Sequence, residues 1–155
     1  MPADIDLHFL EEAYKEAQRA FEKNEVPIGA VIVKDNSIIG RGHNLRITKK
    51  NALYHAEIVA IEDACKTTQN WRLDNSTIYI TLEPCLMCVG AILQSRINKI
   101  VFGALDKKAG ALISSCNALE ICKQPFKVEY EYIEMEKCSN ILTEFFKKLR
   151  GKNDK

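Results

Sequence analysis

Two short segments of the chain carry residue types that could bind a metal ion: His55-Ala56-Glu57 and Pro84-Cys85-Leu86-Met87-Cys88. Each stands where a helix is expected to begin, directly after a predicted loop or strand. Cys85 and Cys88 are three positions apart, so they share one face of their helix. The positive end of the helix dipole lowers the pKa of a thiol there and favours the thiolate, which is the form that binds metals. With the neutral nitrogen of His55, the two segments supply three metal ligands.

Three protein ligands leave the fourth position of a tetrahedral zinc ion open for water, which is typical of catalytic sites, whereas structural sites are closed by four ligands. We therefore expect one Zn²⁺ per chain and a zinc-bound hydroxide as nucleophile. Two thiolates cancel the charge of the ion, so its water should be less acidic than at a site of three imidazoles, where the pKa is about 7.

Glu57 is the expected proton carrier of this site, because a less acidic water needs a proton acceptor nearby. It would take a proton from water, deliver it to a ring nitrogen of the substrate and later protonate a departing amine. General acid–base catalysis of this kind is worth roughly 10²–10⁴-fold in rate. Residues two apart on a helix point to different sides, so His55 and Glu57 can converge only at a helix end.

Other interpretations of these residues are less specific. A lone Cys-x-x-Cys could be a redox pair or half of a structural zinc knuckle, but the upstream His-x-Glu favours the catalytic site. The remaining cysteines have no ligand-like spacing, and Cys65 on an apolar helix face is expected in the core. We expect His8 at the surface, and we expect His43 to be a structural histidine rather than a pocket residue. The other three cysteines are expected to be structural or incidental: Cys116, Cys122 and Cys138.

The hydrophobic periodicity predicts alternating helices and strands. Helices are expected over 5–23, 55–67, 85–95 (with Pro84 at the helix start) and 134–150, and strands over 29–33, 38–44, 77–81, 99–104 and 127–133. An opening hairpin followed by helix-linked strands predicts a mixed sheet of about five strands with helices on both faces, an α/β layered sandwich. A chain of 155 residues fits a single domain over 1–155.

Composition limits the function classes only weakly. The chain has 22 Lys and Arg against 21 Asp and Glu, for a net charge of +1, which argues neither for nor against nucleic acid. It has no run of 18 apolar residues and no secretory signal pattern, so we expect a cytoplasmic protein without a membrane span. Six cysteines in such a setting favour thiolate chemistry or metal binding over disulfides.

The pairing of His55-Ala56-Glu57 with Pro84-Cys85-x-x-Cys88 resembles the cytidine/deoxycytidylate deaminase superfamily, in which the Glu is the acid/base and not a ligand. From about residue 7 to residue 150 the chain is most similar to the bacterial tRNA-specific adenosine deaminases. The run from 81 to 108 is the specific part. It contains Thr81-Leu82-Glu83-Pro84-Cys85, Ser95-Arg96-Ile97 and Phe102-Gly103-Ala104-x-Asp106-x-Lys108.

This resemblance implies a three-layer α/β/α cytidine-deaminase-like fold, a homodimer, and conversion of wobble adenosine to inosine in a tRNA anticodon loop. It implies that Asn44 bonds the flipped base and that Asp106, with Lys108 beside it, meets the sugar–phosphate of the loop. The last helix, with its aromatic and basic end, would lie beside the RNA, although an ordinary solvated helix end is the plainer interpretation. The residues of that helix expected at the RNA are Phe146, Lys147 and Arg150.

Three segments depart from the family pattern and keep two alternatives open. Residues 52–54 read Ala-Leu-Tyr in place of the usual Pro-Thr-Ala, residues 40–46 resemble fungal-type cytosine deaminase, and residues 122–128 are short and lack Asn-His-Arg. One alternative is a small-molecule guanine or cytosine deaminase with the same zinc site. The other is a non-catalytic zinc-containing RNA-binding subunit, against which Glu57 argues because a structural site has no use for a free carboxylate.

Overall fold

The computed structural model describes residues 3–153. The elements occur in the order α1 (Asp4–Glu22), β1 (Gly29–Lys34), β2 (Ser37–His43), α2 (Ala56–Thr68), β3 (Thr77–Ile80), α3 (Leu86–Gln94), β4 (Lys99–Phe102), α4 (Ala118–Ile121), β5 (Glu129–Tyr132) and α5 (Glu136–Asn153). None of the described helices is both long enough and apolar enough to cross a membrane.

The five strands form one mixed sheet, as the sequence predicts, and their order in the sheet is β2-β1-β3-β4-β5. Strand β1 is antiparallel to both of its neighbours, whereas β3, β4 and β5 are parallel. The β1–β2 turn contains Asp35 and Asn36 at positive φ, which asparagine and aspartate tolerate better than most residues and which suits a tight hairpin.

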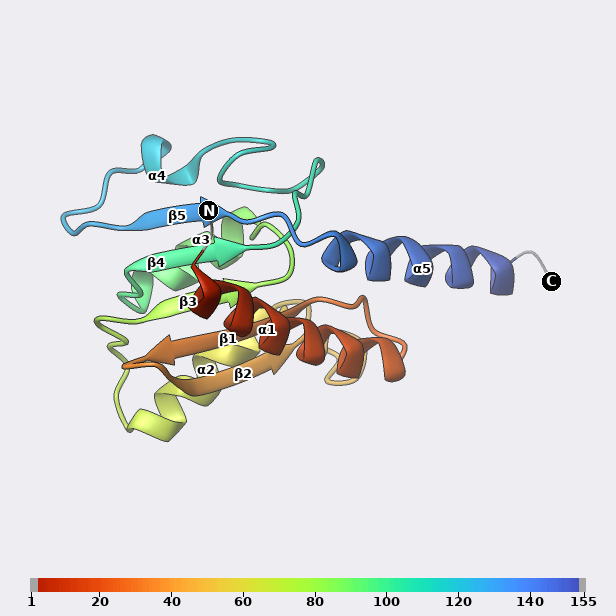
Figure 1. The fold of residues 1–155 in the computed structure, drawn as a ribbon, viewed down its shortest axis with the longest axis horizontal. Coiled ribbons are helices and arrows are strands. Elements are labelled where there is room, and N and C mark those ends of the chain that lie inside the picture. The colour runs from red at the N-terminus through yellow and green to blue at the C-terminus, as the bar shows by residue number, and fades with distance from the viewer. Residues whose placement is uncertain (1–2, 154–155) are drawn as a thin grey trace.

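This topology places the ends of four strands at one edge of the sheet. Strands β2, β3, β4 and β5 point the same way, so the chain leaves each of them at the edge that we call the carboxyl edge (Figure 1). Four segments therefore gather there: the loop after His43, the start of α3, the loop after Phe102, and α5, which projects beyond the sheet.

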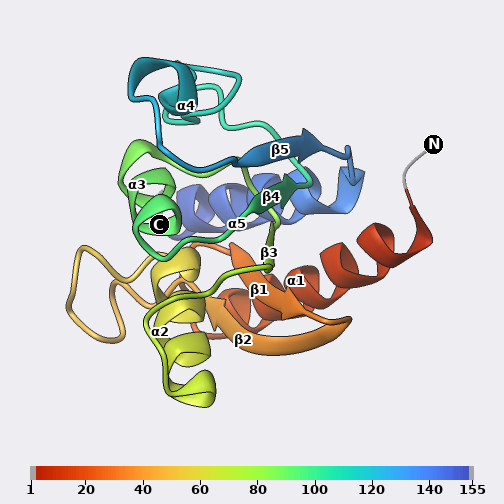
Figure 2. The same cartoon turned by 90° about the vertical axis from the view of Figure 1, so that its left-hand side faces the viewer.

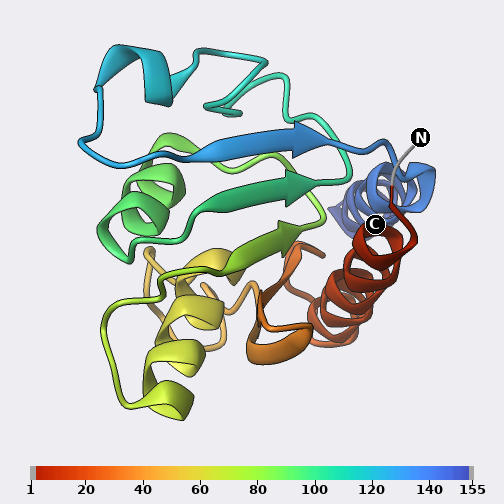
Figure 3. The same cartoon turned by 60° about the vertical axis from the view of Figure 1, so that its left-hand side comes forward.

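The helices cover both faces of the sheet, which confirms the three-layer prediction. Helix α1 packs on one face, through Phe9, Leu10 and Ala13 against the alternating residues Val31 and Val33. Helices α2 and α3 lie side by side on the other face, and α5 lies on the side of α1 (Figures 2 and 3). The core on the α2–α3 face contains Ala30, Ile32, Ile78, Ile80, Ile100 and Phe102.

Several boundaries differ from the sequence prediction. Strands β4 and β5 are shorter than expected, and α3 begins at Leu86, so Pro84 precedes the helix instead of starting it. The short helix α4 was not predicted, because a single turn is too short to show helical periodicity. Its start is nevertheless marked by Asn117, whose side chain accepts a hydrogen bond from the N–H of Leu119.

Two glycines of β2 let α2 approach the sheet closely. A Cβ atom on Gly42 would lie 2.4 Å from the carbonyl oxygen of Ala56 and 2.4 Å from the nitrogen of Ala60, and Gly40 makes similar approaches further along the helix. These are backbone atoms that cannot turn aside as a side chain could. The two glycines therefore set the height of α2 above the sheet, and with it the place of His55 at the start of that helix.

Gly42→Ala should destabilise the protein by about 1–3 kcal/mol, because the added methyl group must push α2 away from β2. Gly151→Ala is the matched control, since Gly151 lies in α5 and a Cβ atom there meets no heavy atom within 4 Å. In a helix this change should be neutral or stabilise the protein by up to about 1 kcal/mol. Urea unfolding measures both changes, and equal stability of Gly42→Ala and the parent would contradict this account of the packing.

Candidate active site

Two of the predicted metal ligands stand one residue before a helix. His55 is the N-cap of α2 and Cys85 the N-cap of α3, and both have extended backbones, with φ and ψ of −68° and 158° and of −77° and 173°. An N-cap is usually Ser, Thr, Asp or Asn, whose side chain bonds the first turn. Here neither side chain caps its helix. Both are free to reach across the gap between the two helices.

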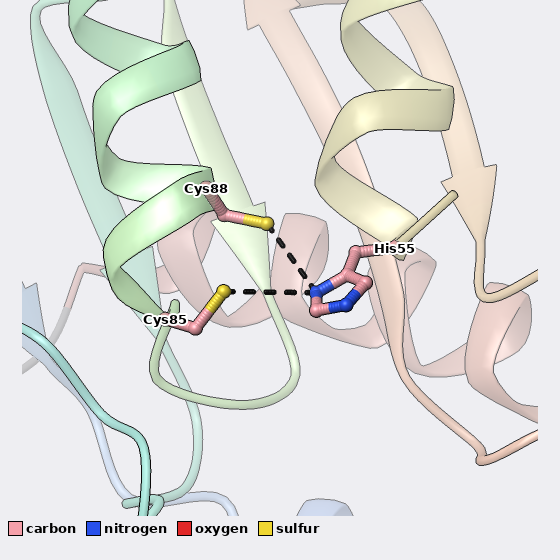
Figure 4. Close-up of side chains that lie close together, drawn as sticks. All are labelled: His55, Cys85 and Cys88. Atoms are coloured by element: carbon pink, nitrogen blue, oxygen red, sulfur yellow. Dashed lines mark hydrogen bonds between the residues drawn. The ribbon is translucent and has the colours of Figure 1, made fainter. Parts of the chain in front are cut away.

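The three predicted ligands converge in this gap (Figure 4). The Nδ1 atom of His55 lies 3.7 Å from the sulfur of Cys85 and 3.6 Å from the sulfur of Cys88, and the three ligand atoms all lie within 4.8 Å of one another. Around a tetrahedral zinc ion, bond lengths of about 2.0–2.3 Å separate N and S ligand atoms by about 3.6 Å. The donor set therefore fits zinc in both chemistry and spacing.

The ionisation of the two thiols also favours a cation. A hydrogen bond from Cys88, supported by His55, lowers the pKa of Cys85 to about 4. The pKa of Cys88 is raised, first because its thiol donates that hydrogen bond and then by burial and the nearby carboxylate of Glu57. Two thiolates and a carboxylate can be ionised together in so small a space only when a cation compensates their charge.

Glu57 lies in the first turn of α2 and is only 4% exposed. Burial, assisted by the negative charge of Cys85, raises its pKa to about 7, although its own backbone N–H and His55 oppose the shift. A divalent cation would lower this pKa again. His55 and Glu57 do converge on the two cysteines, and they can do so because the extended backbone of His55 ends the helical periodicity.

Asn44 follows β2 at the carboxyl edge and is 5% exposed. Its side-chain oxygen accepts a hydrogen bond of 3.2 Å from the N–H of Arg46. It lines a cavity of about 370 Å³ together with residues of the loop that leads to α2, including Arg46, Lys50 and Ala52. With the oxygen held by Arg46, the amide NH₂ group is the part of Asn44 left to bond a ligand in this cavity.

The residues expected at the RNA lie outside the metal-ligand cluster. Asp106 is half-buried in the loop after β4, where one of its carboxylate oxygens accepts the N–H groups of Lys108 and Ala109. The other residues of this set are exposed, and those on α5 belong to a helix fixed against α1 by the ring of Phe145, whose centroid is 5.9 Å from that of Phe21. The exposed residues are Lys108, Phe146, Lys147 and Arg150.

Two buried carboxylates at the carboxyl edge have positions that the sequence pattern did not reveal. Glu25 is 1% exposed and accepts hydrogen bonds from the N–H of Ile47 and from the N–H and hydroxyl of Thr48. Glu83 is 2% exposed and accepts hydrogen bonds from the loop after β4. In the sequence, each of these glutamates is visible only as an acidic residue near an apolar strand. This pattern does not show which groups donate to the carboxylate.

The remaining histidines and cysteines lie in different surroundings. His8 is exposed, as expected. His43 is buried between Glu16 and Lys23, each 3.0 Å from one of its ring nitrogens, so the prediction of a structural histidine is confirmed. All six cysteines are free. Among those outside the metal cluster, Cys138 is buried and Cys122 is exposed.

Comparison with known proteins decides the family. The family model of the MafB19-like deaminases matches residues 6–150. A tRNA-specific adenosine deaminase of Aquifex aeolicus is 47% identical over 93% of this chain and 95% of its own, and one of Bacillus subtilis is 46% identical over 95% and 92%.

The chain belongs to the tRNA-specific adenosine deaminase family.

Solved structures of deaminases share the fold. A structure from a study of A-to-I editing by tRNA:A34 deaminases at the wobble position of transfer RNA has a TM-score of 0.78 and is 35% identical over 90% of this chain and 99% of its own. A guanine deaminase of Bacillus subtilis has a TM-score of 0.62 and is 28% identical over 90% and 92%. Within the deaminases, the chain is thus more similar to the tRNA enzymes than to this guanine deaminase.

We predict that the purified protein contains one zinc ion per chain. Cys85→Ala should lose the metal and much stability, because metal binding in such sites contributes to the free energy of folding. Cys122→Ala, which removes an exposed thiol outside the cluster, should keep both. Elemental analysis with thermal unfolding makes the comparison. Full zinc content in Cys85→Ala would show that the assigned ligands are wrong.

Proposed function

We propose that this protein edits RNA by hydrolytic deamination, converting adenosine to inosine at the wobble position of a tRNA anticodon loop. The observation that carries the proposal is the cluster of His55, Cys85 and Cys88 with the buried Glu57 beside it. The names of its relatives, which are 42–47% identical, support the substrate. In the reaction, water replaces the exocyclic amine of adenine and ammonia leaves.

His55, Cys85 and Cys88 are the residues that would hold zinc. When bound there, the ion supplies the Lewis acidity that makes water a better nucleophile at neutral pH. The protein supplies the arrangement of the donors. The N–H groups at the starts of α2 and α3 have no side-chain cap, and the positive ends of both helices stabilise the negative charge of the thiolates.

Glu57 moves the protons. Its carboxylate accepts a proton from the attacking water and gives it to a ring nitrogen of adenine, and it then carries the second proton to the departing amine. A group does this best when its pKa lies near the working pH, so that it both accepts and donates. Burial of Glu57 shifts its pKa in that direction, and the positive charge of a metal moderates the shift.

Asn44 would recognise the base. The amide NH₂ group can donate a hydrogen bond to a ring nitrogen of a purine in the adjoining cavity, while the bond from Arg46 fixes its orientation. Bases of a single-stranded loop are already partly exposed, so extruding one costs less than the few kcal/mol needed in a duplex. An anticodon loop would therefore present its base to the site at a lower cost than a helical stem would.

The RNA outside the cavity would meet two groups of residues at the carboxyl edge. Asp106 and Lys108 stand on the loop after β4, and Phe146, Lys147 and Arg150 stand on the exposed side of α5. The cations attract phosphates, and an exposed ring can stack on a base. This local patch suffices in a protein whose net charge is only +1.

The assembly and compartment belong to the same proposal. A groove beside α3 and α4, with Leu86 and Ile121 exposed at 63% and 66%, supports a homodimer, and light scattering that returns a monomer mass would overturn it. Six free cysteines and a tRNA substrate support a reducing, cytoplasmic compartment, which fractionation of cells would test.

Glu57→Gln should retain one zinc ion and the fold yet lose at least about 10²-fold in turnover, because the amide cannot carry a proton. Inosine formation and elemental analysis on the same preparation separate the two roles. Loss of zinc would mean that Glu57 is a ligand, and near-native turnover would rule out the proton transfer.

Assays on an RNA stem-loop and on free bases test the proposed substrate. The protein should deaminate an anticodon stem-loop with adenosine at the wobble position and should leave free guanine and cytosine unchanged under the same conditions. Asn44→Ala should lower turnover of the bound stem-loop more than its affinity, because its partner is the base and not a phosphate. Robust turnover of a free base with none of the RNA would instead establish a small-molecule deaminase.

A further inference from the structure

The carboxylate of Glu83 holds most of the loop that follows β4. One of its oxygens accepts the N–H groups of Leu112, Ile113 and Ser114, at 3.1, 2.8 and 2.9 Å. The other accepts the N–H of Asp106 at 3.2 Å and the hydroxyl of Ser114 at 2.6 Å. These five hydrogen bonds join a side chain that is 2% exposed to residues 106–114, which we call the 106–114 loop.

The charge of Glu83 is stabilised by this loop and not by a cation. No ion pair involves Glu83 in the described part of the chain, residues 3–153. Gly110 shows how closely the loop encloses the carboxylate, because a Cβ atom there would lie 2.2 Å from its carbon and 2.3 and 2.4 Å from its two oxygens. Burying a carboxylate is costly unless its oxygens are hydrogen-bonded. The loop therefore stabilises the buried carboxylate, and the carboxylate in turn holds the loop in place.

The place of Glu83 in the chain connects the loop to the metal ligands. Glu83 lies between β3 and α3, two residues before Cys85. Its N–H donates to the carbonyl of Ala104 at 2.8 Å, and the N–H of Ala111 donates to the carbonyl of Pro84 at 2.9 Å. One short segment thus carries a metal ligand and also fixes the 106–114 loop by side chain and backbone. The loop cannot shift without breaking bonds to the segment that carries the metal ligand.

We propose that Glu83 is a positioning residue for the RNA, because its carboxylate fixes the 106–114 loop and so holds Asp106 and Lys108 at a set place relative to the metal ligands. This inference rests on the proposed function, in which those two residues meet the RNA. It assigns to Glu83 an effect on RNA affinity rather than on the chemical step. Every side-chain hydrogen bond that Glu83 accepts comes from the 106–114 loop, so we infer that its carboxylate acts through that loop.

Glu25 provides an internal comparison. It is equally buried and accepts three hydrogen bonds from Ile47 and Thr48, in the loop on the Asn44 side of the site. Glu25→Gln and Glu83→Gln are therefore matched variants, since each replaces one buried oxygen acceptor by an NH₂ group that faces N–H donors. The two variants differ in the loop that loses its hydrogen bonds: residues 47–48 for Glu25→Gln and the 106–114 loop for Glu83→Gln.

Amide hydrogen exchange tests the anchor without any assay of activity. Glu83→Gln should speed exchange at Leu112, Ile113 and Ser114 by about tenfold or more, because buried N–H groups lose their hydrogen-bond acceptor. Exchange at Ile47 and Thr48 should stay unchanged. Glu25→Gln should give the reverse pattern. Unchanged exchange at 112–114 in the Glu83 variant would overturn the proposal.

Steady-state kinetics on the anticodon stem-loop then test the positioning role. Glu83→Gln should raise KM on the order of tenfold, with kcat within about threefold of the parent and full zinc content. Glu83→Asp keeps the charge but has a shorter side chain, so its KM should lie between those of the parent and Glu83→Gln. A loosened loop with KM unchanged, or a loss confined to kcat, would show that the loop does not position the RNA.

A second variant keeps the test independent of the folding of Glu83→Gln. Gly110→Ala keeps the glutamate at position 83, but its added methyl group would clash with the carboxylate and displace the loop. It should therefore speed hydrogen exchange at the same three amides and raise KM, as Glu83→Gln does. Absence of both effects in Gly110→Ala would count against the proposal. If the parent protein fails to act on RNA, the proposed function and the positioning role both fail, while the exchange data still decide whether Glu83 anchors the loop.

Discussion

The amino-terminal ends of α2 and α3 meet at the carboxyl edge of the sheet, and the site depends on this convergence. His55 and Cys85 can face each other because each is the residue before its helix, with an extended backbone that turns the side chain across the gap. Close packing of α2 on Gly40 and Gly42 fixes one side of the gap. The other side is fixed by β3, which runs directly into the segment that carries Cys85. A cation held between them would neutralise charges that could not otherwise lie so close.

Three buried carboxylates at this edge are stabilised in different ways, and the differences match their proposed roles. Glu25 and Glu83 accept backbone N–H groups from loops, which makes both carboxylates anchors. At Glu83 these bonds, with the hydroxyl of Ser114, hold the pKa below its usual value despite burial. Among the described residues, no loop N–H group donates to Glu57, and burial raises its pKa. A carboxylate without such donors can change its protonation state, as proton transfer requires, whereas an anchor must not.

Residue type and spacing were sufficient to predict that His55, Cys85 and Cys88 come together, because three donors and one free carboxylate within two short segments have few other uses. Hydrophobic alternation was sufficient to predict the strands of the mixed sheet. Successive residues of a strand point to opposite faces, so the pattern is visible within a few neighbouring residues. The contacts of Glu25 and Glu83 could not be predicted in this way. Their partners are 22 to 31 positions away in sequence, and hydrogen bonds from loop backbones leave no trace in residue type. The residues proposed to meet the RNA were predicted by resemblance alone, since solvated lysines on a helix end look the same with or without RNA.

We propose above all that two cysteines and one histidine hold zinc and leave one position open for water. X-ray absorption at the zinc edge of the purified protein tests it most directly. The account predicts two sulfur ligands at about 2.3 Å and two nitrogen or oxygen ligands at about 2.0–2.1 Å, one of them not supplied by the protein. The Cys122→Ala variant should give the same spectrum, because its thiol lies outside the cluster. A shell of four sulfurs, or one without sulfur, would contradict the account.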